Sequence, residues 1–278
     1  KHVFEFTPDQ EWPANDQIVG EMRLSFSGPG TMWLDCWRVY PKDKGFMGVP
    51  QADIDDLRAS GMAFLRTHAF IKSGWSYFLD DLTNAAGVVG RRGNVNDAPT
   101  STLFSILGFL KQARVNPWLQ IEMSLAEDEW QGLVEYLAAP YDPAKDSATS
   151  KPWAAKRFSM GQTRPWTDEF PKILFEVSNE TWNPHPGFAP WHFPWQKMTD
   201  AATGRVYSGG ELSGLMTGYI LAQMKKSPYW STLKAKMETV AGGWLVQLDD
   251  NGFGQAAVRM CRDITHNLVA NYNGGWDE

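Results

Sequence analysis

The stretch ILFEVSNETW, residues 173–182, runs from apolar to polar and aromatic residues within ten positions. Its first half has the length and the β-branched and aromatic content of a buried strand. Asn179 and Glu180 follow this strand directly, and Trp182 comes two residues later. The segment therefore predicts a strand of a parallel sheet whose carboxyl end carries polar side chains.

Helices and strands are expected to alternate on both sides of this stretch. The helices are predicted at residues 51–60, 103–114 after an N-cap at Thr100, 126–138, 210–226 and 252–261; the strands at 63–70, 118–123, 173–178, 237–241 and 267–272. The segment 140–164 is expected to be a polar, proline-containing excursion. This alternation predicts an α/β fold, specifically a TIM (β/α)8 barrel. A doubly wound sheet is the alternative, but no glycine-rich phosphate-binding motif follows any strand.

The first forty residues have a different pattern, with short alternating runs and a turn at residues 27–30. Three antiparallel strands cannot close a sandwich, so residues 1–42 are interpreted as the end of a β-sandwich. Residues 43–278 are then the barrel domain.

The composition excludes several classes of protein. With 43% apolar and 21% charged residues among 278, the chain is expected to be globular. Its net charge is -6, and no run of Lys or Arg suggests a nucleic-acid partner. No apolar stretch reaches the roughly 18 residues of a membrane span, and no signal-peptide pattern follows Lys1. Cys36 and Cys261 fit neither a disulfide framework nor a zinc site.

Tryptophan is abundant, with 14 residues. Trp118 and Trp130 lie in apolar runs and are expected in the core. Trp182, Trp191 and Trp195 lie in a loop of Pro, His and Gly, where they are candidates for a ligand surface.

Glu180 and Asn179 are the leading candidates for chemistry. Hydrolysis of a glycosidic bond usually takes two carboxyl groups, one of which protonates the leaving oxygen. A barrel places such groups after its strands, as Glu180 is placed here, and the Asn179 amide suits a sugar hydroxyl. The alternative is an N-cap or turn role for this pair.

On these residues the chain resembles the clan A glycoside hydrolases. The resemblance rests on FEVSNETW, with FLRT on an early strand and ANYNGGWD on a later one, and covers roughly residues 45–278. It implies a retaining mechanism with Glu180 as acid/base after the fourth barrel strand. The clan usually has Pro after Asn-Glu, whereas Thr181 stands here. The strand TMWLDCWRVY likewise resembles the last strand of carbohydrate-binding sandwiches that precede such barrels.

The same resemblance implies roles for residues on other strands. Arg66 resembles the Arg that supports the nucleophile from strand two, with His68 beside it, although a buried structural salt bridge is an alternative for Arg66. Tyr272 resembles the residue placed near the nucleophile after strand six, with core packing as the alternative. The clan's nucleophile ends strand seven, which our strand count puts beyond Glu278. A second chain or a missing segment is therefore expected to complete the barrel.

Other side chains complete the predicted site. Glu122 is expected to hydrogen-bond a sugar near the barrel mouth, and Trp182 and His185 to contact one. Glu238 is a fallback carboxylate, and Glu211 is explained by its place at a helix start.

We expect neither a metal nor a cofactor. His185 and His192 lack a third ligand, and residues 249–252 lack the closing Glu of a calcium loop.

The expected function is that of a retaining glycosidase that acts on a poly- or oligosaccharide and is secreted, periplasmic or at the cell surface. A non-catalytic glycan-binding or structural protein with a degenerate or truncated barrel is the alternative. An esterase is disfavoured because no G-x-S-x-G motif is present.

Overall fold

The computed structural model describes residues 27–31, 51–67, 78–84, 102–181, 198–244 and 254–270. The chain divides into two compact units, Lys1–Asp35 and Cys36–Glu278. In the first unit the structure describes residues 27–31, where the backbone bends at Gly28 with φ of 101°. The rest of the expected sandwich, residues 1–42, lies outside the described residues. All helices and strands below belong to the second unit.

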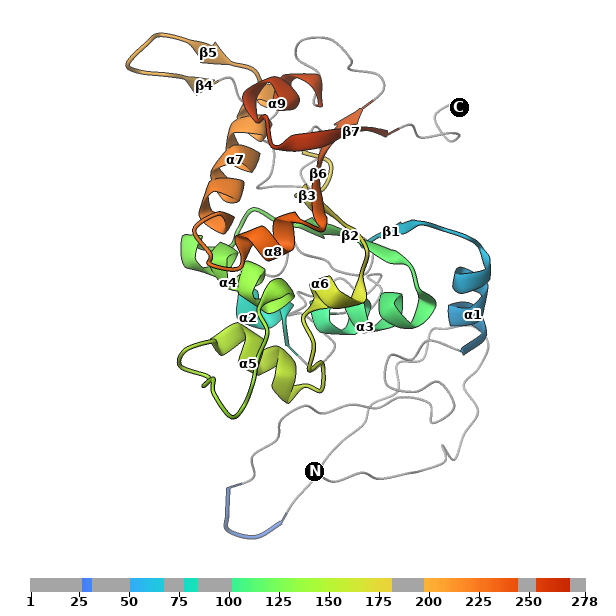
Figure 1. Ribbon diagram of the computed structural model, residues 1–278. Coiled ribbons are helices and arrows are strands. Elements are labelled where there is room, and N and C mark those ends of the chain that lie inside the picture. The colour runs from blue at the N-terminus through green and yellow to red at the C-terminus, as the bar shows by residue number, and fades with distance from the viewer. Residues whose placement is uncertain are drawn as a thin grey trace. The chain divides into compact units, whose positions relative to one another are not determined.

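Five parallel strands form the central sheet (Figure 1). They are β1 (Phe64–Arg66), β2 (Asn116–Ile121), β3 (Ile173–Val177), β6 (Met237–Trp244) and β7 (Ile264–Ala270). Their order across the sheet is their order along the chain. A doubly wound sheet reverses its strand order at a switch point, whereas consecutive barrel strands do not. The described part of the chain is thus an α/β fold with the strand order of a partial TIM barrel.

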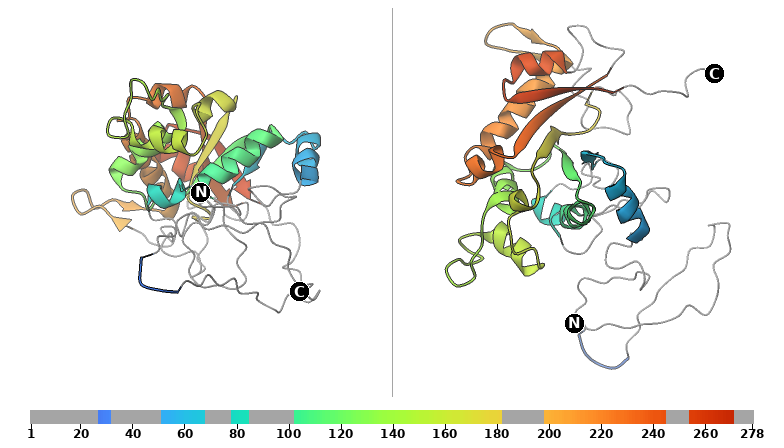
Figure 2. Two further views of the ribbon diagram at one scale, coloured as in Figure 1. Left: turned by 90° about the horizontal axis from the view of Figure 1, so that it is seen from below. Right: turned by 45° about the vertical axis from the view of Figure 1, so that its right-hand side comes forward.

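Helices connect the strands, as parallel pairing requires. They are α1 (Gln51–Ala59), α2 (Leu79–Leu82), α3 (Leu103–Ala113), α4 (Glu127–Ala138), α5 (Pro152–Ser159), α6 (Trp166–Glu169), α7 (Gly209–Met224), α8 (Trp230–Lys234) and α9 (Gln255–Met260). A small antiparallel hairpin of β4 (Met198–Thr199) and β5 (Val206–Tyr207) precedes α7 and projects beyond it in every view (Figures 1 and 2). Among the described residues, no helix is long and apolar enough to cross a membrane.

Several boundaries differ from the sequence prediction. The N-cap of α3 is Thr102 rather than Thr100, because the Thr102 side chain accepts a hydrogen bond from the Ser105 N–H. The segment 140–164 is not irregular throughout, since it contains α5; the buried face of α5 includes Arg157, which conceals the apolar periodicity. The last strand begins at Ile264, three residues earlier than expected.

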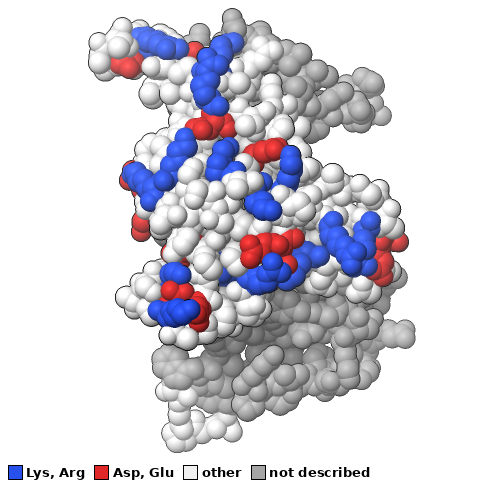
Figure 3. Space-filling model, viewed as in Figure 1, with Lys and Arg blue, Asp and Glu red and all other residues white. Residues whose placement is uncertain are grey.

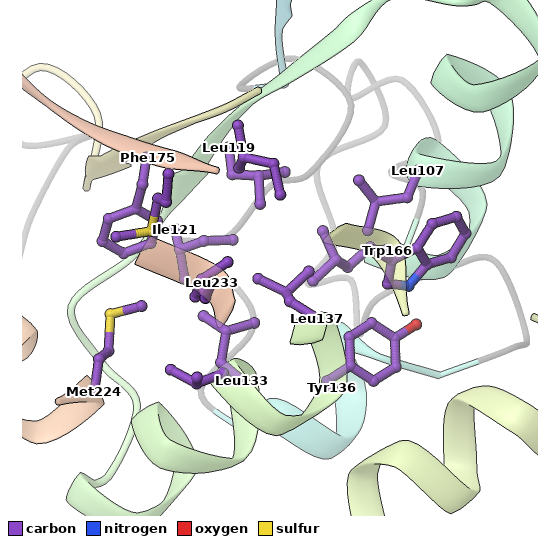
Figure 4. Packing of buried hydrophobic residues seen from close by; sticks show 14 of the residues in the cluster. Leu107, Leu119, Ile121, Leu133, Tyr136, Leu137, Trp166, Phe175, Met224 and Leu233 are labelled. Carbon is purple, nitrogen blue, oxygen red and sulfur yellow. The ribbon is translucent and has the colours of Figure 1, made fainter. Parts of the chain in front are cut away.

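One face of the sheet packs against the helices and forms the core. Leu119, Ile121 and Phe175 of β2 and β3 meet apolar side chains of α3, α4, α6, α7 and α8 (Figure 4). The Trp130 and Phe175 rings meet edge to face with centroids 6.3 Å apart. Trp130 is 1% exposed, which confirms its predicted place in the core. Burial of this face is what holds helices and strands together.

The opposite face of the sheet carries polar and charged side chains among apolar ones. Arg66 of β1 pairs with Trp118 of β2. Gln120 of β2 pairs with Glu176 of β3, which in turn pairs with Val240 of β6. Because side chains alternate along a strand, these residues face away from the helix-covered core. Trp118 lies in this layer, is only partly buried and is not part of the apolar core cluster, so its predicted place in the core is wrong. In a barrel this face lines the interior.

On the face of the molecule shown in Figure 3, basic side chains lie beside acidic ones rather than in separate patches. Lys225 and Asp263, for example, form an exposed ion pair of 2.6 Å.

Candidate active site

The turn after β3 brings Asn179 and Glu180 to the carboxyl edge of the sheet. Ser178 and Glu180 adopt positive φ angles of 59° and 45°, which non-glycine residues seldom do. The turn is held by two hydrogen bonds: the Ser178 N–H donates to the Ile121 carbonyl at 2.8 Å, and the Met123 N–H donates to Ser178 Oγ at 3.3 Å. Backbone strain of this kind tends to gather at functional sites.

Arg66 joins β1 to β3 and to the turn. Its Nε donates to Glu176 Oε2 at 2.7 Å, and its Nη2 donates to Glu176 Oε1 at 2.8 Å. The same Nη2 also donates to Asn179 Oδ1 at 2.9 Å. The Arg66 guanidinium carbon lies 5.8 Å from the centroid of the Trp118 ring on β2. Arg66 thus forms the structural salt bridge that was the alternative role for it, and the same side chain also binds Asn179.

Burial dominates the electrostatics of Glu176. Its side chain is 2% exposed, and burial raises the pKa of this carboxyl above its ordinary value. The hydrogen bonds and positive charge of Arg66 act to lower that pKa, whereas the negative charge of Glu180 acts to raise it. Glu176 and Glu180 therefore interact electrostatically.

Asn179 and Glu180 differ in accessibility. Asn179 is 3% exposed, whereas Glu180 is partly exposed. Among the described residues, Asn179 Nδ2 makes no hydrogen bond. The turn thus offers a buried amide donor beside a carboxyl group that solvent reaches.

Glu122 follows β2 at the same edge of the sheet. It is 4% exposed, and its Oε1 accepts a hydrogen bond from Gln120 Nε2 at 2.8 Å. Its predicted contact with a sugar stays a prediction.

The remaining predicted site residues lie outside the described part of the chain. These are His68, Trp182, His185 and Tyr272. Their predicted roles stay predictions. Among the described residues, no group of three His, Cys, Asp or Glu side chains is arranged to hold a metal ion.

Two other carboxylates serve the structure. Glu238 stands at the amino end of β6, where it accepts a hydrogen bond from Lys172 at 2.8 Å and contacts His266 at 2.6 Å. Lys172 and His266 lower the pKa of Glu238 through these contacts. Glu211 forms a capping box with Ser208 at the start of α7, which confirms its interpretation as a helix-start residue.

Glu176 is the site residue that the sequence prediction missed. It interrupts the otherwise apolar run ILFEV, which is predicted as a buried strand. A carboxylate in a strand that is otherwise buried requires a cationic partner, and Arg66 is two strands away in the sheet. That requirement indicates that Glu176 has a cationic partner, and the order of the strands in the sheet shows that the partner is Arg66.

Comparison with known proteins gives no match in sequence. No protein-family model matches the chain, and no curated protein matches it.

Comparison of folds gives clear neighbours. A structure reported as an arabinofuranosidase superposes with a TM-score of 0.54 at 14% identity over 85% of this chain and 42% of its own. A family 51 alpha-L-arabinofuranosidase from Bifidobacterium longum gives 0.53 at 16% identity, covering 85% of this chain and 41% of its own. The GH51 arabinofuranosidase from Xanthomonas axonopodis pv. citri gives a TM-score of 0.52 at 18% identity, covering 85% of this chain and 42% of its own.

The likeness establishes the fold. This chain spans less than half the length of these neighbours. The five parallel strands in chain order correspond to part of the barrel of a glycosidase. The sequence prediction of a TIM-barrel fold is confirmed.

Proposed function

We propose that this chain carries the acid/base half of the active site of a retaining glycoside hydrolase, with Glu180 as general acid and then general base. The observation that carries the proposal is the turn after β3, where a strained backbone presents Glu180 beside the buried Asn179 amide. This edge is where barrel enzymes place their catalytic groups. The fold neighbours, which are arabinofuranosidases, support a sugar glycoside as the substrate.

The proposed chemistry has two steps. In the first step the nucleophile bonds to the anomeric carbon as the glycosidic bond breaks, and protonated Glu180 gives its proton to the leaving oxygen. In the second step water attacks the same carbon and displaces the nucleophile, while ionised Glu180 takes the proton of that water. Asn179 Nδ2 donates to a hydroxyl of the same sugar. The nucleophile is proposed to come from a further barrel strand in another segment or a second chain.

A leaving-group series on the full-length protein tests the role of Glu180. Glu180→Gln should lower kcat/KM for an unactivated phenyl α-L-arabinofuranoside by roughly 10² to 10⁴, since general acid catalysis is worth about that much. The 2,4-dinitrophenyl glycoside should lose far less in the bond-breaking step, because its leaving group departs without a proton. Glu127→Gln, on the exposed start of α4, is the matched control and should leave both rates unchanged.

Azide tests the retaining mechanism with the same protein. In Glu180→Ala with the 2,4-dinitrophenyl substrate, added azide should restore turnover and give a glycosyl azide of retained configuration, because an anionic nucleophile needs no general base. Equal losses on the phenyl and dinitrophenyl substrates would refute the acid/base role. Tight binding of arabino-oligosaccharides without any turnover by the wild-type protein would favour a glycan-binding function instead.

A further inference from the structure

The orientation of the Asn179 amide is fixed by its neighbour. Arg66 has only hydrogen-bond donors, so the amide atom that meets Nη2 at 2.9 Å has to be the oxygen. The NH2 group is then directed away from Arg66. Since Asn179 is 3% exposed, an amide turned the other way would place its buried NH2 group against another donor.

Arg66 is in turn fixed by Glu176. The two nitrogens Nε and Nη2 bind both oxygens of the Glu176 carboxylate, an arrangement that sets the plane of the guanidinium group as well as its position. Nη2 is shared by Glu176 Oε1 and Asn179 Oδ1. The Trp118 ring lies beside the guanidinium as a third constraint.

The three side chains come from distant parts of the sequence. Arg66 is 110 residues from Glu176 and 113 from Asn179. A salt bridge that only tied β1 to β3 would need the two bonds to Glu176 and no more. The third bond, to the amide beside Glu180, connects the ion pair to the candidate site.

We propose that Glu176 is a positioning residue, which acts through Arg66 to hold the Asn179 amide with its NH2 group ready for a sugar hydroxyl. This inference rests on the proposed function of the Asn179-Glu180 turn. Glu176 itself does not contact the substrate. Its contribution is to specificity for the sugar that bears this hydroxyl, because a donor held in one orientation selects substrates that offer an acceptor there.

A double-mutant cycle in the full-length protein tests the connection. Glu176→Gln and Asn179→Ala should each lower kcat/KM for the aryl glycoside by roughly 10- to 100-fold, since small errors in positioning cost about that much. If Glu176 acts through Asn179, the double variant should lie within about threefold of Asn179→Ala. Losses that multiply in the double variant would overturn the proposal.

Monodeoxy glycosides supply a reading that a structural role does not change. For each deoxy substrate, the loss of kcat/KM relative to the parent glycoside is measured in wild type and in Asn179→Ala. The hydroxyl that the amide binds is the one whose removal lowers kcat/KM in wild type but has the least effect in Asn179→Ala. Glu176→Gln should lose discrimination at that same hydroxyl. Glu238→Gln is the matched control, because Glu238 also forms an ion pair on the sheet but does not contact Arg66. A uniform loss on all substrates in Glu176→Gln would overturn the proposal.

A nuclear magnetic resonance measurement separates this inference from the proposed function. The side-chain amide signal of Asn179, assigned by its disappearance in Asn179→Asp, should shift and exchange faster with water in Glu176→Gln than in wild type. Glu238→Gln should leave it unchanged. If wild-type protein hydrolyses no glycoside but the signal responds, the proposed function fails and the positioning contact stands. If the signal does not respond to Glu176→Gln, the positioning role is refuted whatever the activity.

Discussion

Replacing Arg66 by methionine should destabilise the protein strongly, because it leaves the Glu176 carboxylate buried without its cation. The substitution removes three hydrogen bonds of 2.7, 2.8 and 2.9 Å. Glu176 cannot reach water instead, since its side chain is 2% exposed. Loss of one partner of a buried ion pair costs about 3–5 kcal/mol, and we expect the free energy of unfolding to fall by this amount at pH 7.

The loss should depend on pH with a definite sign. Without Arg66, burial and the charge of Glu180 raise the pKa of Glu176 further above its ordinary value of 4.5. A carboxyl whose pKa is higher in the folded state stabilises the fold fully below its unfolded pKa, and this stabilisation is lost as the pH rises through its folded pKa. The deficit of Arg66→Met relative to wild type should therefore grow with pH, by up to about 1.4 kcal/mol for each unit between the wild-type and variant pKa values.

Urea unfolding at several pH values between 5 and 8 measures this deficit. Arg66→Met/Glu176→Leu should recover most of the lost stability, because removing both charges of a buried pair is often neutral. Lys225→Met is the matched control: its ion pair with Asp263 is about 40% exposed on both sides, and its loss should cost less than about 1 kcal/mol. A deficit below about 1 kcal/mol for Arg66→Met, or one that does not change with pH, would refute this account.

Two further predictions concern the scaffold. Arg157→Met should lower the free energy of unfolding in urea by about 3–5 kcal/mol, because the buried Arg157 donates to the carbonyls of Tyr136, Ala139 and Gln162. No helical N–H can replace the bond to Tyr136, since residue 140 is a proline. Lys145→Met, at an exposed position, should change stability by less than about 0.5 kcal/mol, and similar losses for the two variants would contradict the prediction. Gly214→Ala should destabilise the protein by about 1–3 kcal/mol, since its new methyl group would lie 2.5 Å from the Ala257 carbonyl oxygen, where α7 meets α9. Gly218→Ala in the same helix would place its methyl group 3.7 Å from Cys261 and should be neutral or stabilising. Thermal unfolding of the two variants checks the contrast, and an equal effect would argue against close contact of the helices.

The pattern of the strands could be predicted from the sequence because it depends on local features. Apolar runs that alternate with amphipathic segments predicted the parallel sheet, and ILFEVSNETW predicted β3 with polar residues at its carboxyl end. Boundaries were less accurate where local signals compete. Thr100 and Thr102 are both plausible N-caps, and the choice depends on which hydroxyl meets a free N–H.

The sequence by itself determined that this chain is an α/β protein, and that Asn179 and Glu180 stand where a strand of a barrel ends. Only the tertiary structure decided which groups surround them. Arg66 and Glu176 are 110 residues apart, and nothing local indicates that the cation needed by one buried carboxylate is that particular arginine. Parallel pairing of β1, β2 and β3 brings the two together and adds the bond to Asn179, because the position of a side chain in a sheet depends on register across strands rather than on separation along the chain.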